Sequence, residues 1–273
     1  MMKSNGVRRF FAACLVTFVF VGCIGAAAML VKALWPSTGE DVCVKGDFTL
    51  DVSHASEGYI MAKREACSSG LKMRISKGNA VYTYDLNNKG EYEVFPLQMG
   101  SGTYQCSLYR NVKSNKFSKE AELKFSVELN DDAGAFLYPS QYVYYTPESL
   151  AVQASMEICE GLETDEQKLD AIIKFVSENF AYEYDRARSN PGFYLGDVDG
   201  CYETRIGLCQ DLAAMTACML RVQGIPTQLV IGYANKQYHA WNSVLVDGEY
   251  QLLDITAEVT GVPASVYTVE RYY

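Results

Sequence analysis

Three residues with chemically reactive side chains lie in the last third of the sequence: Cys209, His239 and Asp254. A cysteine thiolate is a nucleophile, an imidazole can take the proton from the thiol, and a carboxylate can hold the imidazole in the required orientation. The sequence has only two histidines, and His239 is one of them. These residue types predict attack on a carbonyl group, with Cys209 as nucleophile, His239 as base and Asp254 as the orienting acid.

A helix that begins directly after Gly207 is expected to position the thiol. Apolar side chains recur three and four residues apart, the spacing of one buried helix face, at Leu208, Leu212, Met215, Met219 and Val222. Gly224-Ile225-Pro226 follows this run and marks its end. Cys209 therefore falls in the first helical turn, where free backbone N–H groups favour a thiolate and an oxyanion.

A β-hairpin is expected to bring the imidazole and the carboxylate together. Its strands are His239–Val246 and Glu249–Ile255, and Asp247-Gly248 between them is a strong signal for a two-residue turn. In that register Asp254 lies opposite Trp241, so His239 and Asp254 are diagonal neighbours on one face, with Cβ atoms roughly 7 Å apart. An imidazole and a carboxylate can bridge that gap.

The sequence around these residues resembles the transglutaminase-like superfamily. The resemblance lies in Gly207-Leu208-Cys209-Gln210-Asp211, Gly224-Ile225-Pro226, Val230-Ile231-Gly232-Tyr233, His239-Ala240-Trp241 and Leu253-Asp254-Ile255-Thr256, and it covers residues 146–273. It implies a papain-like Cys-His-Asp fold, in a family that includes transglutaminases, cysteine proteases and peptide N-glycanases. It also implies Cys209, His239 and Asp254 as the catalytic residues. Isoleucine stands at position 255, where the family often has proline.

The sequence leaves the oxyanion donor open. The backbone N–H of Cys209 is one expected donor, and Tyr194, Tyr202 and Gln210 are candidates for a second donor from a side chain. Trp241 is expected on the same face as His239, where it would shield the pair from water. Asp211 lies in the first turn of the helix and is interpreted as a structural residue.

No metal or cofactor is expected. Two histidines, with no HExxH motif and no paired CxxC motifs, argue against a zinc site. The sequence also contains no glycine-rich phosphate loop and no GxSxG motif.

An uncharged apolar segment, Phe10–Val31, follows Arg8-Arg9. A membrane-spanning helix needs roughly 20 such residues, and the basic flank predicts a cytoplasmic N-terminus. We therefore expect a cytoplasmic segment over residues 1–9, a transmembrane anchor over 10–34 and an extracytoplasmic catalytic domain at the cell membrane. A lipoprotein processed at Cys23 and a secreted protein with a cleaved signal peptide are the alternatives. Besides the nucleophile, six cysteines follow the anchor and could form up to three disulfides; the alternative is that most of them are reduced and buried.

The expected fold class is α+β. After a linker (residues 35–42), seven short β-runs between Asp47 and Leu129 predict an immunoglobulin-like β-sandwich over residues 43–130. Tyr104, two residues before Cys106, resembles the tyrosine corner of that fold, which raises the possibility of a Cys67–Cys106 disulfide. A connector (131–145) leads to a papain-like transglutaminase core over residues 146–273, in which a central helix packs on an antiparallel sheet. This core is expected to contain helices from Pro147 to Glu160 and from Thr164 to Phe180, and a long loop over Ala181–Arg205.

The expected function is attack on a peptide or glutaminyl carbonyl through a thioester acyl-enzyme. Hydrolysis would make the protein a cysteine protease or amidase, transfer to an amine would make it a transglutaminase, and an inactive surface binding or adhesion module is a third possibility. The expected partners are a protein or peptide substrate, such as a cell-surface or cell-wall peptide, and the membrane through the N-terminal helix. The net charge of -9 argues against nucleic acid as a partner.

Overall fold

The computed structural model describes residues 38–189 and 194–273. The expected membrane anchor over residues 10–34 lies outside these ranges. Within them, no helix has both the length and the apolar character needed to cross a membrane.

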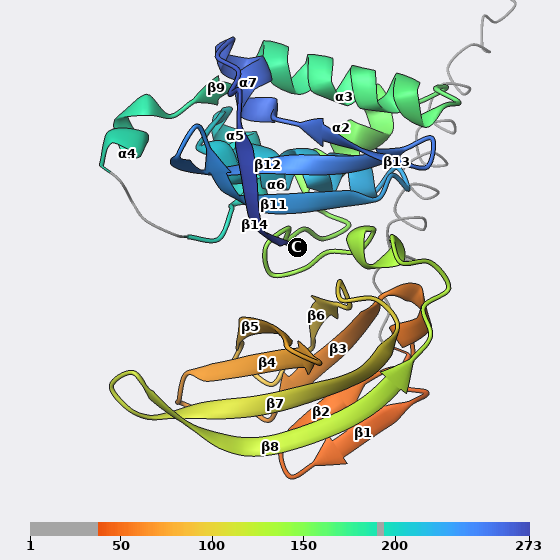
Figure 1. Ribbon diagram of the computed structural model, residues 1–273, viewed down its shortest axis with the longest axis vertical. Helices are drawn as coiled ribbons and strands as arrows, with labels where there is room; N and C mark the ends of the chain where they lie inside the picture. The colour runs from red at the N-terminus through yellow and green to blue at the C-terminus, as the bar shows by residue number, and fades with distance from the viewer. Residues whose placement is uncertain (1–37, 190–193) are drawn as a thin grey trace, which may run out of the picture.

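The first part of the chain forms two four-stranded antiparallel sheets (Figure 1). One sheet has the order β1-β2-β3-β6 and contains Val42–Lys45, Phe48–Asp51, Tyr59–Arg64 and Glu93–Pro96. The other has the order β5-β4-β7-β8 and contains Ala80–Leu86, Leu71–Lys77, Gly102–Lys113 and Lys116–Val127. Each of the seven expected strands has a counterpart here, and β1 is an addition.

Alternation along the strands explains how these sheets bury one face. In β4, Leu71, Met73 and Ile75 are buried whereas Arg74 between them is exposed. Tyr104 is also buried, and its hydroxyl donates to the carbonyl oxygens of Leu97 and Gly100 at 3.0 and 2.8 Å. None of the possible disulfides forms, the considered Cys67–Cys106 pair included, because all seven cysteines from Cys43 to Cys218 are free thiols.

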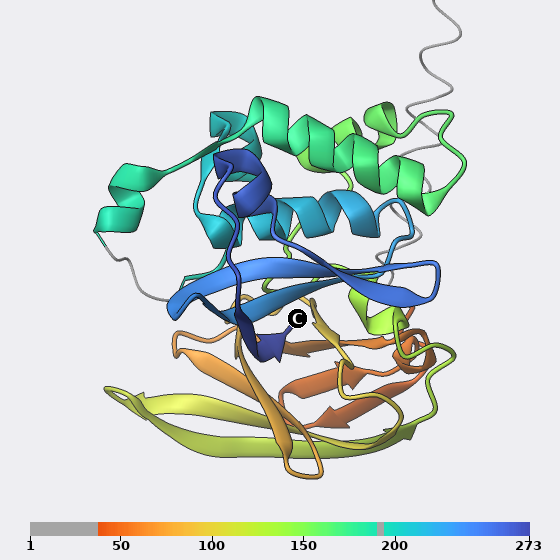
Figure 2. The same cartoon turned by 45° about the horizontal axis from the view of Figure 1, so that its top comes forward.

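The second part packs helices against a four-stranded antiparallel sheet of order β13-β12-β11-β14 (Figures 1 and 2). Its strands are Glu249–Leu253, Gln237–Val246, Thr227–Ala234 and Tyr267–Tyr272. Helix α6 (Cys209–Arg221) lies on this sheet, and all its residues from Gln210 to Arg221 are buried. Helices α2 (Leu150–Ile158), α3 (Asp165–Asn179) and α7 (Ile255–Thr260) surround α6.

Of two sequence-based expectations for the helical segments, one is confirmed and one is wrong. Thr164 caps α3 through a capping box with Gln167, as the spacing of these two residues predicts. The expected long loop over 181–205 was wrong. It contains β9 (Ala181–Tyr182), α4 (Tyr184–Arg188) and α5 (Val198–Thr204), which are too short to show a periodic pattern and are stabilised by tertiary contacts.

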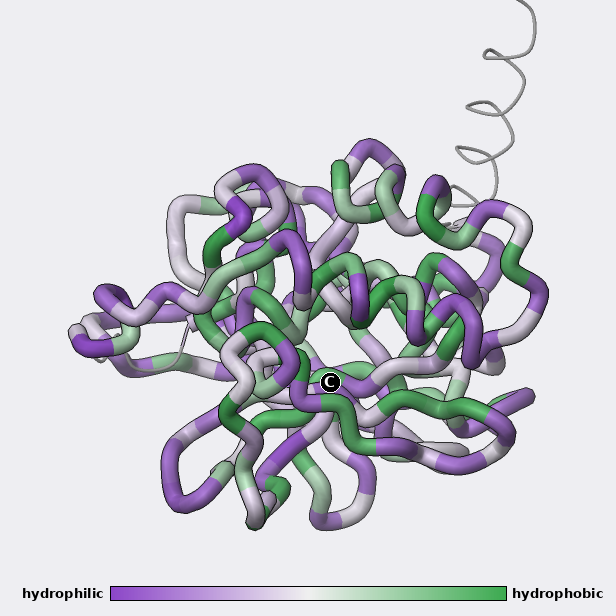
Figure 3. Tube along the Cα trace, turned by 90° about the horizontal axis from the view of Figure 1, so that it is seen from above, coloured by the Kyte–Doolittle hydropathy of each residue, from purple (hydrophilic) through white to green (hydrophobic). Residues whose placement is uncertain are grey.

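An aromatic cluster joins the two parts of the molecule. The ring of Tyr273 stacks on Tyr142 at a centroid distance of 3.5 Å and meets Tyr82 and Tyr84 of β5 edge-on. Arg271 of β14 donates to the carbonyl oxygen of Val81 at 2.8 Å. By contrast, α4 projects from the side of the molecule, and its residues are mostly hydrophilic (Figures 1 and 3).

Candidate active site

The partly exposed Cys209 is the first residue of α6. Strand β10 (Ile206–Gly207) leads the chain to this position and pairs in parallel with β9. A Cβ atom on Gly207 would lie 2.8 Å from Sγ of Cys201 and 2.9 Å from Cβ of Asp211, so only glycine fits at this position, two residues before the helix. The thiol therefore lies at a helix N-terminus, where the backbone N–H groups of the first turn have no intrahelical acceptor.

His239 and Asp254 come from the hairpin of β12 and β13 in the register that the sequence predicts. Val246 pairs with Glu249 and Asn242 with Leu253, so the two turn residues are Asp247 and Gly248. Both have positive φ, 53° and 81°, as a type I′ turn requires. Asp254 directly follows the last paired residue, and its Oδ2 lies 2.9 Å from Nε2 of His239.

The tautomer of His239 follows from this contact. A carboxylate can only accept, so Nε2 carries the proton that it donates to Asp254. Nδ1 is then the ring nitrogen left for the side chain of Cys209, whose proximity helps to raise the pKa of His239. The structure thus brings the three residues together, with the imidazole held by the carboxylate and under the electrostatic influence of the thiol.

These contacts favour charge on His239. Burial opposes protonation, but the hydrogen bond to Asp254 and the proximity of Cys209, together with their negative charges, raise the pKa of His239 to about 9. Burial alone would raise the pKa of Asp254, yet the contacts with His239 and Tyr267 hold that pKa below its ordinary value. The imidazolium and the carboxylate are therefore both charged near neutral pH.

Asp254 has three further donors besides the imidazole. The backbone N–H groups of Thr256 and Ala257 donate to its Oδ1 at 3.1 and 3.2 Å, which makes Asp254 the N-cap of α7. The hydroxyl of Tyr267 in β14 donates to Oδ2 at 2.8 Å. Sequence reasoning missed Tyr267, because no pattern revealed that β14 pairs with β11.

Trp241 lies beside the imidazole, as expected from its face of the hairpin. Its ring stacks on that of His239 at a centroid distance of 6.1 Å, and Tyr267 packs against it edge-on at 5.2 Å. The indole is only 2% exposed, so it covers one side of the imidazole. Gly232 makes room for it, because a Cβ there would lie 3.0 Å from the indole and 2.1 Å from the carbonyl oxygen of Thr268.

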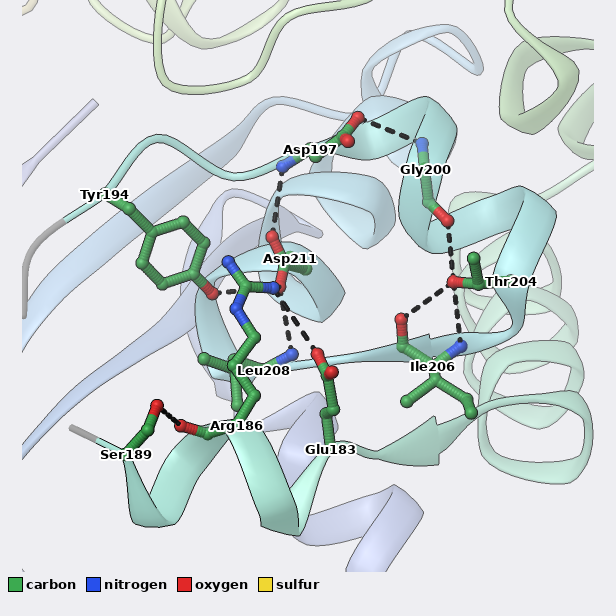
Figure 4. A network of polar contacts seen from close by, with 10 residues as sticks. All are labelled: Glu183, Arg186, Ser189, Tyr194, Asp197, Gly200, Thr204, Ile206, Leu208 and Asp211. Carbon is green, nitrogen blue, oxygen red and sulfur yellow. Dashed lines mark hydrogen bonds and ion pairs between the residues drawn. The ribbon is translucent and has the colours of Figure 1, made fainter. Parts of the chain in front are cut away.

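A second polar network centres on Asp211, which is 2% exposed (Figure 4). Its Oδ2 accepts from the hydroxyl of Tyr194 at 2.9 Å, from Nη1 of Arg186 at 3.2 Å and from the backbone N–H of Leu208 at 3.0 Å. Its Oδ1 accepts from the backbone N–H of Asp197 at 3.1 Å. Asp211 thus fastens the segments on both sides of residues 190–193 to the start of α6.

The three side chains considered as oxyanion donors are placed differently. The hydroxyl proton of Tyr194 is directed at Asp211. The ring of Tyr202 packs against Phe180 and under the guanidinium of Arg205, whose Cζ lies 4.0 Å from its centroid. Gln210 is 4% exposed, and its Nε2 has neither solvent contact nor a hydrogen-bond partner among the described residues. The choice of the oxyanion donor among these three residues stays a prediction.

A cavity of 780 Å³ lies on the β9–α4 side of the α6 N-terminus. Its lining includes Tyr182, Arg186, Asp197, Cys201 and Asp211. Within residues 38–189 and 194–273, no group of three or more histidine, cysteine or acidic side chains is arranged to hold a metal ion.

A thiol at a helix N-terminus, beside an imidazole that a carboxylate holds, is a set of groups suited to nucleophilic attack on a carbonyl. In the comparison with known protein families, residues 152–255 match the transglutaminase-like superfamily, so the chain contains a transglutaminase-like domain. A search of curated proteins gives no match.

The solved structures that are similar to the chain include the following three. A proposed cysteine protease from Cytophaga hutchinsonii has 14% identity and a TM-score of 0.40, over 79% of this chain and 86% of that one. A transglutaminase has 22% identity and a TM-score of 0.36, over 42% and 32%. The red sea bream transglutaminase has 12% identity and a TM-score of 0.33, over 74% and 48%.

Proposed function

We propose that this protein is a thiol enzyme that cleaves a peptide or carboxamide bond through a thioester on Cys209. The observation that carries the proposal is the 2.9 Å contact between His239 and Asp254 together with the position of Cys209 at the N-terminus of α6. His239 holds the thiol proton as imidazolium, and Asp254 stabilises that charge.

In the first half-reaction, the thiolate sulfur gives its electron pair to the carbonyl carbon and a C–S bond forms. The π pair moves to the carbonyl oxygen, which becomes an oxyanion. When that pair returns, the C–N bond breaks, and the imidazolium of His239 gives its proton to the departing nitrogen. The products are a free amine, or ammonia from a glutaminyl side chain, and a thioester.

In the second half-reaction, neutral His239 takes a proton from water, and the hydroxide formed displaces the thiolate to give a carboxylic acid. An amine acceptor would give a cross-link instead. Water needs no binding site of its own, whereas an amine must be bound to compete with water in large excess. Hydrolysis is therefore the proposed outcome, and transglutamination is the alternative.

The test begins with mass spectrometry of the full chain after a short exposure to iodoacetamide. Cys43 and Cys67 are also partly exposed thiols, so they are internal controls for ordinary reactivity. We expect Cys209 to be labelled much faster than these two, and the excess rate to disappear in His239→Ala. Equal rates at all three cysteines would refute the enzyme and leave a binding or adhesion module with this fold.

A glutaminyl peptide, incubated with and without a primary amine, then separates the two outcomes. Release of ammonia with formation of glutamate indicates hydrolysis, and incorporation of the amine indicates transfer. If the amine is incorporated in preference to water, the hydrolase proposal is wrong and the transglutaminase alternative holds.

The remaining parts of the chain fit an accessory role. We propose that residues 43–130 are an immunoglobulin-like spacer or ligand-binding module, supported by their two antiparallel sheets and the hydroxyl contacts of Tyr104. We also propose that Phe10–Val31 anchors the chain in the cell membrane with the catalytic part outside, as its sequence indicates. Protease digestion of intact cells would then remove the catalytic part, and full protection would refute this orientation.

A further inference from the structure

Two exposed tyrosines lie beside the proposed base, at the end of the hairpin of β11 and β12. Tyr233 and Tyr238 are paired across the two strands, and Tyr238 directly precedes His239. Their rings meet edge-on at a centroid distance of 5.7 Å, and the residues are 40% and 47% exposed. Each ring therefore holds the other in place at the surface, where a bound molecule can reach a π face.

The tyrosine pair is also close to the nucleophile. Burial raises the pKa of Tyr238, and the nearby Cys209 adds to that rise, as it adds to the raised pKa of His239. The thiol thus lies within electrostatic reach of the tyrosine as well as of the imidazole. A peptide whose carbonyl group reaches Cys209 can therefore place a neighbouring side chain against Tyr238.

A β-bulge brings a carboxylate to the same place. Gly232 pairs with Val269 and Ile231 with Arg271, so Glu270 between them has no partner on β11. An extra residue of this kind bends the strand and changes the direction of its side chain. After burial, the negative charge of Glu270 is the largest cause of the raised pKa of Tyr238, which places this carboxylate near the ring.

The charge of Glu270 has no counter-ion among the residues that the structure describes. The residue is exposed, and its carboxylate forms neither an ion pair nor a hydrogen bond with any of them. The adjacent cation, Arg271, instead donates to the carbonyl oxygen of Val81 and lies over the ring of Tyr82, with Cζ 5.3 Å from the centroid. A free carboxylate beside aromatic rings suits an ammonium or guanidinium group, which both features attract.

We propose that Tyr233, Tyr238 and Glu270 bind a basic side chain, lysine or arginine, that lies close to the reacting carbonyl group in the peptide substrate. This inference rests on the proposed function and names the substrate class. No bond to these three residues forms or breaks, because they only select the substrate. An acidic side chain at the same position would meet the like charge of Glu270 and be disfavoured.

Two iodoacetyl peptides measure this preference at Cys209 without requiring turnover. Iodoacetyl-glycyl-arginine amide carries a guanidinium, and its citrulline analogue has nearly the same shape without the charge; versions with two and three glycines cover longer distances. In the full chain, the arginine-to-citrulline ratio of alkylation rates should be about 5-fold higher at Cys209 than at Cys43 and Cys67 for the best spacer. A guanidinium is not an acceptor amine, so the ratio reports recognition of the substrate.

Glu270→Gln should lower this ratio by about 3-fold, and Glu249→Gln is the matched control. Glu249 is an exposed residue of β13 that pairs with Val246 beside the turn at the other end of β12, so its replacement changes the net charge equally. It should leave the ratio at the wild-type value. Tyr238→Leu should lower the ratio by about 2-fold, whereas Tyr238→Phe keeps the ring and should keep the preference.

Three results would overturn the inference. The first is an equal ratio at Cys209, Cys43 and Cys67 with every spacer. The second is an equal fall in Glu270→Gln and Glu249→Gln, because the preference would then come from the overall charge of the protein. The third is a wild-type ratio in Tyr238→Leu, which would exclude the rings from the site. The citrulline peptides test the proposed function separately: if they do not label Cys209 faster than Cys43 and Cys67, that function fails whatever the ratio.

Discussion

Replacing Asp254 by asparagine separates two tasks that one carboxylate performs. Oδ1 caps α7 and Oδ2 holds the imidazole. Asparagine keeps an oxygen for the cap and places an uncharged NH₂ group in the position of Oδ2, so α7 should remain intact. The charge that stabilises the imidazolium of His239 is lost.

The magnitude follows from the pKa of His239, which rises from an ordinary 6.5 to about 9. The folded state holds this proton more tightly than the unfolded chain does. The associated stability is complete below about pH 6.5 and is lost as the pH rises through about 9. A shift of 2.5 units corresponds to about 3 kcal/mol, and the His239 side chain is only 15% exposed.

The assay is urea unfolding of the wild type and Asp254→Asn at about pH 6 and about pH 9.5. The free energy of unfolding of the wild type should fall by about 3 kcal/mol more than the other titrating groups explain. In Asp254→Asn this fall should shrink to roughly half, because Cys209 alone still favours the imidazolium. Groups that do not contact Asp254 or His239 titrate equally in both proteins, so the difference between the two profiles reports the titration of His239 and its direct partners. Identical profiles would refute the assignment of that proton to the His239–Asp254 pair.

Three further substitutions test the structure around the site. Tyr267→Phe removes a hydrogen bond to the charged Oδ2 of Asp254 and should lower the free energy of unfolding by about 2 kcal/mol at neutral pH. Because folding lowers the pKa of Asp254, this loss should fade in urea titrations at acid pH, where the carboxylate becomes protonated. A loss that does not depend on pH would contradict this. Arg221→Met should lower the free energy of urea unfolding by about 3 to 5 kcal/mol. The reason is that the fully buried guanidinium donates to the main-chain oxygens of Thr227, Tyr138 and Tyr273. A melting temperature like that of the wild type would show that those oxygens find other donors. Gly232→Ala should lower the free energy of unfolding by about 1 to 3 kcal/mol and slow iodoacetamide labelling of Cys209. The added Cβ overlaps the carbonyl oxygen of Thr268 and presses on the indole of Trp241 beside His239. Wild-type stability and labelling would mean that β14 shifts without effect.

The sequence predicts those parts of the site that depend on local chemistry. Asp247-Gly248 determines the turn, the turn determines the register of β12 and β13, and the register places Asp254 beside His239. The start of α6 is similarly local, because Gly207 and the apolar repeat mark it.

The parts that the sequence did not reveal depend on contacts between distant segments. β9 and β10 have two residues each and carry no periodic signal, so the position of Tyr182 opposite Gly207 emerges only from their pairing. Strand β14 is largely exposed and lacks the alternation of a half-buried strand, which hid Tyr267. Arg221 reads as an ordinary charged residue at a helix end, yet it is fully buried among main-chain oxygens.

The order of the site residues along the chain has a consequence for biosynthesis. The nucleophile is translated first, the imidazole thirty residues later, the carboxylate after that, and Tyr267 last. A growing chain that has reached Cys209 carries an ordinary thiol, because neither His239 nor Asp254 has yet been made. On the proposed mechanism, the ribosome and its neighbours meet Cys209 before it is activated, because activation requires β11, β12, β13 and β14 to leave the exit tunnel and assemble into one sheet.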